Sequence, residues 1–81
     1  MLPEEMEQLV RERIAARRKR LKLNQSELAR RLQCSPAYVN QVESGERSLG
    51  VGTLAKFADA LETTASKLTA ERSHADKLAI A

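Results

Sequence analysis

The sequence has 81 residues, with 14 lysine and arginine residues against 11 aspartate and glutamate residues, and a formal net charge of +3. A chain of this length supports one small domain with one core. The length therefore disfavours an enclosed catalytic cleft built from many residues. Tyr38 and Phe57 are its only aromatic residues and β-branched residues are sparse, so the composition favours closely packed helices and disfavours sheets.

The first predicted helix covers about residues 4–21. Pro3 suits a helix start, and the acidic residues Glu4 and Glu5 complement the positive end of the helix dipole. The apolar residues that recur on one face are Met6, Val10, Ile14 and Leu21, with Leu9 beside them. Arg18 lies on that same face, where a charged head group requires a partner such as a carboxylate.

Two short helices are predicted next, at about residues 25–33 and 36–43. Asn24 with Glu27 three residues later has the pattern of a capping box, and Ser35 followed by Pro36 repeats the signal for a helix start. The second of these helices should stop at Ser44-Gly45. The expected inward residues are Leu28, Ala29, Leu32, Val39 and Val42. The interval between the two helices is too short to be a free loop.

Residues 46–50 are expected to form an exposed connection, followed by a helix over about residues 51–61. Its expected apolar face consists of Val51, Leu54, Ala58 and Leu61, with Phe57 beside it. Thr63 or Thr64 should cap a fifth helix with Ala65 and Leu68 inward. The tail, residues 69–81, either extends this helix through Ala75 and Leu78 as a dimer contact or frays.

The whole chain, residues 1–81, is expected to be a single domain. Its core should lie at about residues 9–68, with an N-terminal helix extension at residues 1–8.

The positive charge is concentrated between residues 8 and 31, where nine basic residues face Glu12 and Glu27 for a net charge of +7. Residues 1–7 carry three acids and no base, and residues from 32 onward carry a net charge of −1. A basic surface of this kind indicates a polyanionic partner, and nucleic acid is the commonest one. A solvated helix face is the alternative explanation. We expect the block to bind mostly phosphate.

The spacing of apolar residues from Gln25 onward is that of a helix-turn-helix. Counted from Gln25 as the first position, interior residues fall at the fourth, fifth, eighth, tenth, fifteenth and eighteenth positions: Leu28, Ala29, Leu32, Cys34, Val39 and Val42. Two short helices that cross at roughly 90–120° must bury a shared apolar seam. The fifth position must be small because the helices nearly touch there, and Ala29 satisfies that restriction.

These residues resemble the helix-turn-helix domain of lambdoid phage repressors and Cro proteins, the Xre-like family. The matching segments are Leu23–Ala29, Val39–Gly45, Leu54 and Phe57–Leu61. The resemblance implies an all-α, five-helix, lambda-repressor-like domain whose second and third helices form the helix-turn-helix. It also implies that the third helix enters the major groove of double-stranded DNA, usually within a homodimer on a palindromic operator. Arg18 and Glu43 match a structural ion pair typical of the family.

The resemblance also assigns roles at the interface. Ala37 and Gln41 match the positions that face base edges, with Asn40 nearby; glutamine and asparagine can read adenine bidentately, and Ala37 can touch a thymine methyl group. The expected phosphate-positioning residues are Lys22, Asn24, Gln25, Ser35, Tyr38, Ser44 and Arg47. Alternatives remain for several of them: helix capping for Gln25, packing for Tyr38 and simple solvation for Arg47.

The chain departs from the family pattern at four places. Gln33 stands at the left-handed position of the turn, where many relatives have glycine, at an expected cost on the order of 1 kcal/mol. Lys22 replaces a glycine that commonly ends the first helix. Leu49-Gly50 replaces a usual proline and serine, so the path of the 45–50 loop is not given by the resemblance. Pro36 and Ala37 replace common polar readers, and the operator sequence therefore cannot be inferred by analogy.

The remaining signals argue against catalysis. Cys34 fills an apolar slot, and packing explains it better than a redox function; one cysteine and the lone His74 form neither an internal disulfide nor a zinc site. No phosphate loop, catalytic triad or paired carboxylates are recognisable, so no enzyme and no cofactor are expected. No apolar run approaches the roughly 18 residues of a membrane span, and the acidic N-terminus is unlike a secretory signal, which predicts a cytoplasmic protein without a membrane partner.

Two functions compete. The first is a sequence-specific transcriptional regulator that acts on RNA polymerase at a promoter. The second is an antitoxin or adaptor whose main ligand is a partner protein such as a toxin, held by the acidic N-terminal residues or the tail, with autoregulatory DNA binding. Single-stranded or structured RNA is disfavoured because the chain offers almost no aromatic stacking surface.

Overall fold

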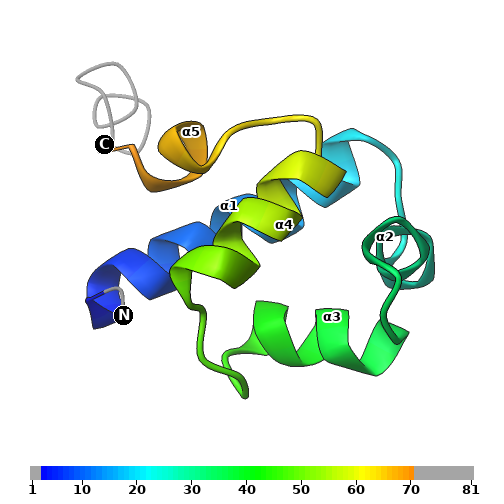
Figure 1. The fold of residues 1–81 in the computed structure, drawn as a ribbon, viewed down its shortest axis with the longest axis horizontal. Helices are drawn as coiled ribbons and strands as arrows, with labels where there is room; N and C mark the ends of the chain where they lie inside the picture. Colours follow the sequence, from blue (N-terminus) through cyan, green and yellow to red (C-terminus); the bar gives the residue numbers. More distant parts are fainter. Residues whose placement is uncertain (1–2, 71–81) are drawn as a thin grey trace.

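The computed structural model describes residues 3–70, and within that range the chain forms five helices and no strand. They are α1 (Glu4–Arg20), α2 (Gln25–Leu32), α3 (Pro36–Ser44), α4 (Val51–Ala60) and α5 (Ala65–Thr69). In Figure 1, α3 runs along the bottom of the molecule, α2 stands at its right-hand end, and α4 lies in front of α1. The predicted all-α, five-helix class is confirmed.

The helix starts follow the predicted capping signals. Asn24 Oδ1 accepts the Glu27 N–H at 2.7 Å, and the Glu27 carboxylate accepts the Asn24 N–H at 3.0 Å, which completes a capping box. Ser35 Oγ accepts the Tyr38 N–H at 3.2 Å at the start of α3. Of the two threonines considered for α5, Thr64 is the cap, since its hydroxyl accepts the Lys67 N–H. Local side chains therefore satisfy one first-turn donor in each of α2, α3 and α5.

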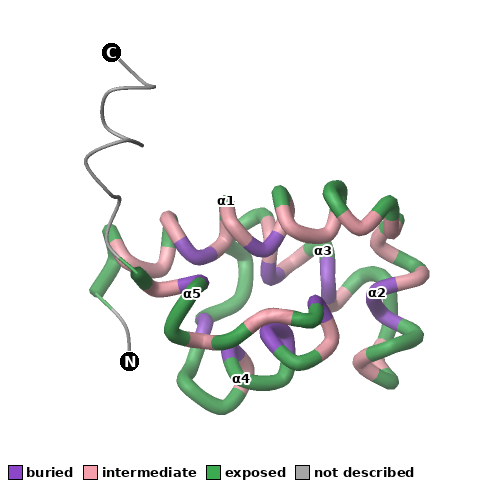
Figure 2. Tube along the Cα trace, turned by 90° about the horizontal axis from the view of Figure 1, so that it is seen from above, coloured by how far each residue is buried: buried purple, intermediate pink, exposed green. Residues whose placement is uncertain are grey.

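The core lies between α1 and the other four helices, as the buried segments in Figure 2 show. Its members are Val10, Ile14, Leu28, Ala29, Val39, Val42, Leu49, Leu54, Phe57, Ala58, Leu61 and Leu68. Met6, Leu21, Leu32, Cys34, Tyr38 and Ala65 pack against it while remaining partly exposed. The core is almost entirely aliphatic, as the composition predicts, and Phe57 is its largest buried side chain.

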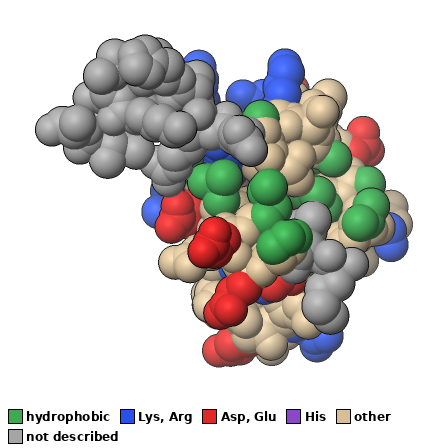
Figure 3. All heavy atoms as spheres, turned by 90° about the vertical axis from the view of Figure 1, so that its left-hand side faces the viewer, with side chains coloured by type: hydrophobic (Ala, Val, Ile, Leu, Met, Phe, Trp, Pro, Cys, Tyr) green, Lys and Arg blue, Asp and Glu red, His purple; other side chains and the backbone are tan. Residues whose placement is uncertain are grey.

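Two predictions about residues 46–51 are wrong. Leu49, expected in an exposed connection, is completely buried, whereas Val51, expected on the inner face of α4, is 66% exposed. Leu49 precedes the N-cap Gly50 and Leu54 is the fourth residue of α4, which is the register of a hydrophobic staple. The Leu49 N–H donates to the Glu7 carboxylate at 2.9 Å, so a contact with α1 holds the loop inward. Val51 is thereby turned outward. Figure 3 shows several hydrophobic side chains at the surface, on the side of the molecule that faces left in Figure 1.

Among the described residues, three other than glycine have left-handed backbone conformations: Lys22 at φ 60°, Gln33 at φ 56° and Glu62 at φ 58°. Gln33 ends α2 with ψ 45°, as expected for the turn of the helix-turn-helix. Lys22 lies in the turn after α1, where the family pattern has glycine. Such conformations cost L-residues on the order of 1 kcal/mol each, so the fold tolerates some strain at the ends of α1, α2 and α4.

Three arginines of α1 bind the C-terminal ends of α3, α4 and α5. Arg11 Nη1 donates to the Val42 carbonyl oxygen of α3 at 2.6 Å. Arg17 donates to the carbonyl oxygens of Leu61 at 2.9 Å and Glu62 at 3.0 Å, just after α4. Arg13 donates to the carbonyl oxygens of Leu68, at 3.1 Å, and Ala70 at the end of α5. The last carbonyls of a helix lack intrahelical donors and carry partial negative charge, so each guanidinium stabilises a helix end.

The α5 helix ends at Thr69, and Ala70 is extended with ψ 142°. The remaining predictions for the tail, including those for His74, Ala75 and Leu78, lie outside the described residues. Within residues 3–70, none of the helices has the length and apolar character needed to cross a membrane.

Candidate nucleic-acid interface

The α2 and α3 helices pack against each other more extensively than any other pair in residues 3–70. The turn between them consists of Gln33, Cys34 and Ser35, and the Cys34 N–H donates to the Ala29 carbonyl oxygen at 2.9 Å. Val39 and Val42 are completely buried. The opposite side of α3 is solvent-facing, with Pro36, Ala37, Asn40 and Ser44 exposed and Gln41 partly exposed. The helix therefore presents an uncharged, polar surface.

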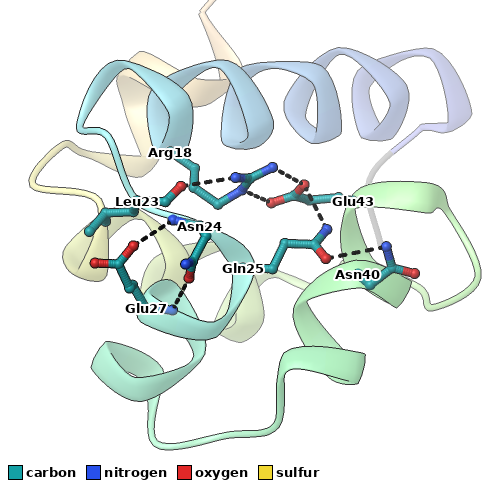
Figure 4. A network of polar contacts seen from close by, with 7 residues as sticks. All are labelled: Arg18, Leu23, Asn24, Gln25, Glu27, Asn40 and Glu43. Atoms are coloured by element: carbon teal, nitrogen blue, oxygen red, sulfur yellow. Dashed lines mark hydrogen bonds and ion pairs between the residues drawn. The ribbon is translucent and has the colours of Figure 1, made fainter.

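Arg18 and Glu43 form an ion pair that joins α1 to α3 (Figure 4). Arg18 Nε and Nη2 donate to the two oxygens of the Glu43 carboxylate at 2.7 and 3.1 Å, and Nη1 donates to the Leu23 carbonyl oxygen at 2.9 Å. The side chains are only 11% and 9% exposed. This bidentate pair compensates the charge on the apolar face of α1 and fixes the end of α3 against the rest of the domain.

The polar network continues from Glu43 to the surface of α3. Gln25 Nε2 donates to Glu43 Oε1 at 3.3 Å, and Gln25 Oε1 accepts from Asn40 Nδ2 at 3.4 Å. Gln25 stands at the start of α2, so its amide bridges the two helices of the helix-turn-helix (Figure 4). Neither helix capping nor phosphate contact, the two roles considered for Gln25 from the sequence, anticipates this bridge. Gln25 and Glu43 are 18 residues apart in the sequence, so no pattern of neighbouring residues indicates that they are in contact.

A second side-chain cluster lies at the end of α3. Arg47 Nε donates to Gln41 Oε1 at 2.6 Å, and the Arg47 guanidinium carbon lies 5.3 Å from the centre of the Tyr38 ring. The Tyr38 ring in turn packs beside Phe57, with ring centroids 6.3 Å apart. Tyr38 therefore packs against the core with one part of its ring and supports an arginine with another, which favours the packing alternative for its ring.

Several expected phosphate contacts already have intramolecular partners. The side-chain oxygens of Asn24 and Ser35 accept helix-capping hydrogen bonds, and Ser44 Oγ donates to the Gln41 carbonyl oxygen at 3.3 Å. Lys22 is exposed in the turn after α1. Because the capping box uses the N–H groups of Asn24 and Glu27, the first-turn N–H groups of Gln25 and Ser26 are left without partners among residues 3–70.

The basic block of residues 8–31 is largely structural. Five of its nine basic side chains hold backbone carbonyls or carboxylates: Arg11, Arg13, Arg17, Arg18 and Arg31. Arg31 donates to the Ala60 carbonyl oxygen and to Glu62, both at 3.0 Å. Lys19, Arg20, Lys22 and Arg30 have no such partner in the described range and are exposed or at its surface. The expectation that the block mostly binds phosphate stays a prediction, and five of its nine basic side chains already have intramolecular partners.

Cys34 packs against the core while remaining partly exposed, which agrees with a packing residue. Desolvation by burial raises the pKa of its thiol above the ordinary value. The part of the chain that the structure describes contains no group of three or more histidine, cysteine, aspartate or glutamate side chains placed to hold a metal ion.

Comparison with known proteins identifies the class. The family model described as helix-turn-helix matches residues 14–68, more than half of the chain. The fold is similar to that of a solved structure titled as a hypothetical transcription factor, NHTF, from Neisseria, with a TM-score of 0.76, 24% sequence identity, and coverage of 100% of this chain and 93% of that one. A search of curated proteins gives no match.

A buried helix-turn-helix seam, an exposed α3 and the family match together define a DNA-binding regulator of transcription, not an enzyme. The chain belongs to the helix-turn-helix family of the Cro/C1 type, the Xre-like family that its sequence resembles.

Proposed function

We propose that the protein is a sequence-specific regulator that binds operator DNA in the cytoplasm as a homodimer, with α3 in the major groove. The observation that carries this proposal is the outer surface of α3. It is exposed and uncharged up to Glu43, and it offers the amides of Asn40 and Gln41 and the methyl group of Ala37. Amide and methyl groups can read base edges, and without a charge they are attracted to phosphate less strongly than basic side chains are.

The register on DNA would be set by groups around this surface. The open N–H groups of Gln25 and Ser26 at the start of α2 fit a phosphate, because a helix N-terminus combines free donors with partial positive charge. Lys22 and Arg47 would add positive charge on either side. Asn24, Ser35 and Tyr38 remain proposed phosphate contacts through the donor groups that their intramolecular hydrogen bonds leave free. Ser44 also remains a proposed contact, but its single hydroxyl donor must first leave the Gln41 carbonyl oxygen.

Gln25 has a second role in this proposal. Its contacts with Glu43 and Asn40 connect the reading side chain to the buried Arg18–Glu43 pair, so the Asn40 amide is supported before DNA arrives. A reader whose orientation is already fixed loses less conformational entropy on binding, which increases affinity and selectivity.

The test is a titration of the protein against a DNA fragment that carries its own promoter, at several salt concentrations. Binding should weaken steeply as salt increases, because each phosphate contact releases counterions. A selection of bound sequences from a random DNA pool should then return two half-sites whose centres are about 34 Å apart, as expected for two α3 helices in successive major grooves. Affinity that does not change with salt contradicts the DNA-binding proposal, and a single half-site contradicts the dimer.

A further inference from the structure

Gln41 and Arg47 form a fixed side-chain pair at the edge of the proposed reading surface. The Arg47 guanidinium donates through Nε to Gln41 Oε1 at 2.6 Å, and the Arg47 backbone N–H donates to the Gln41 carbonyl oxygen at 3.2 Å. The Tyr38 ring, 5.3 Å from the guanidinium carbon, supports the same side chain from below. Three contacts to α3 thus hold one arginine, although it lies in the loop after the helix.

This pair allows only one orientation of the Gln41 amide. A guanidinium has hydrogen-bond donors and no acceptor, so it pairs with the amide oxygen and repels the amide NH2 group. Rotation of the amide by half a turn would bring the Gln41 NH2 group against the N–H groups of the Arg47 guanidinium, and two donors do not form a hydrogen bond with each other. Arg47 therefore directs Oε1 toward itself and leaves Nε2 without a partner among the described residues. The group of Gln41 that is wholly free to bind another molecule is therefore a donor, whereas Oε1 already accepts from a charged partner.

We propose that Arg47 is a positioning residue that makes Gln41 a hydrogen-bond donor toward DNA, so that the base read by Gln41 is guanine and not adenine. This inference rests on the proposed function. In the major groove guanine presents two acceptors, O6 and N7, whereas adenine presents the N7 acceptor and the N6 donor. Bidentate reading of adenine requires the amide oxygen to accept from N6 as well, and an oxygen that already accepts a charge-assisted hydrogen bond from Arg47 is a weaker acceptor for a second donor.

A simpler role for Arg47 makes different predictions. If Arg47 contacts only a phosphate, its removal weakens binding to all sequences alike and lowers the salt slope by about one. If it orients Gln41, its removal also changes which base is preferred at one position. The base preference therefore separates positioning from phosphate attraction, even if Arg47 contributes to both.

The experiment selects bound sequences from a random DNA pool with the wild type, Gln41→Ala, Arg47→Ala and a control, Lys56→Ala. Lys56 is an exposed lysine on α4, so its removal lowers the net charge by the same amount without touching the pair. The position that loses its preference in Gln41→Ala is the one that Gln41 reads. There the wild type and the control should select guanine, and in Arg47→Ala the guanine-to-adenine ratio should fall by about tenfold.

Affinities of the two single variants and the double variant for the selected site complete the test. Coupled losses, in which Arg47→Ala costs little once Gln41 is alanine, support positioning. Adenine at this position in the wild type, or an unchanged base preference with additive losses, overturns the inference and leaves the proposed function standing. Binding that is insensitive to salt and selects no sequence overturns both.

Discussion

Arginines on α1 and the arginine after α3 make different kinds of contact in this protein. On α1, Arg11, Arg13 and Arg17 donate to carbonyl oxygens at the ends of α3, α5 and α4. After α3, Arg47 donates to the side chain of Gln41 on the exposed surface. The α1 arginines are turned toward the protein, and Arg47 lies where the proposed DNA contact is.

The comparison teaches that a charge count does not map a DNA-binding surface. The block of residues 8–31 holds a net charge of +7, but five of its arginines bind backbone carbonyl oxygens or carboxylates, whereas α3 carries no basic residue. A helix C-terminus with partial negative charge competes with phosphate for the same guanidinium groups. The two regions should therefore respond differently to substitution: changes on α1 should alter the stability, and changes at α3 should alter the affinity for DNA.

The largest effect is expected at the buried ion pair. Arg18→Ala leaves the Glu43 carboxylate, 9% exposed, without its main partner, and the free energy of unfolding should fall by about 3–5 kcal/mol. Urea unfolding measures this loss. The matched control is Arg20→Ala, an exposed α1 arginine, which should change stability by less than about 0.5 kcal/mol. Replacement of both partners by apolar residues, Arg18→Met with Glu43→Leu, should recover most of the stability; no recovery would show that the pair does more than neutralise charge.

The next effect tests the helix-end contacts themselves. Arg17→Ala removes two hydrogen bonds to carbonyl oxygens after α4 and should lower the unfolding free energy by about 1–2 kcal/mol. The salt dependence of DNA binding should keep its slope, because this guanidinium is not available to phosphate. A reduced slope with unchanged stability would reverse the assignment and return Arg17 to the DNA interface.

Substitution at α3 should have the opposite profile. Gln41→Ala should weaken binding to the selected site by about 1–3 kcal/mol, with little change on random DNA. Gln8→Ala, the same chemical change at an exposed position of α1, should leave binding to both DNAs unchanged. Equal losses on selected and random DNA would mean that Gln41 does not read a base, and the contrast between the two regions would then rest on Arg47 alone.

The parts of this arrangement that sequence reasoning predicts are those with local signals. Helix starts are indicated by short patterns that span at most four residues, and the structure has the helices there. These patterns are Asn24 with Glu27, Ser35 with Pro36, and Thr64. Apolar periodicity likewise identifies most of the core. These predictions succeed because capping and amphipathicity depend on neighbours in the chain.

The predictions that fail depend on contacts between distant residues. Leu49 is buried because Glu7, 42 residues earlier, binds its N–H, and Arg17 caps a helix end 44 residues later. Neither of these two contacts can be recognised from the residues that neighbour Leu49 or Arg17 in the sequence. A weaker clue was available: every helix end exposes carbonyl oxygens that need donors, and basic residues on a central helix are natural donors. The same reasoning finds no signal for the Gln25 bridge or the Gln41–Arg47 pair.

Gln33 and Gln8 provide a smaller test of the backbone. Gln33→Gly should stabilise the protein by up to about 1 kcal/mol, because glycine adopts φ 56° without the strain of a β-carbon. Gln8→Gly, inside α1, should destabilise it by a similar amount, since glycine is unfavourable in a helix interior. Thermal unfolding compares the two. The same sign for both would show that the turn between α2 and α3 is not strained.

The smallest effect concerns Cys34, in that turn. Burial raises the pKa of its thiol, so the folded state favours the protonated form. Its contribution to stability should be complete below the thiol pKa of the unfolded chain, about 8.5, and should be lost as pH rises through the higher folded value. At pH 8 iodoacetamide should modify Cys34 more slowly in the folded protein than in urea, because the thiolate is the reactive species. Equal rates would mean that the thiol is as well solvated in the turn as in the unfolded chain, and the α2–α3 seam would then be looser than its buried valines indicate.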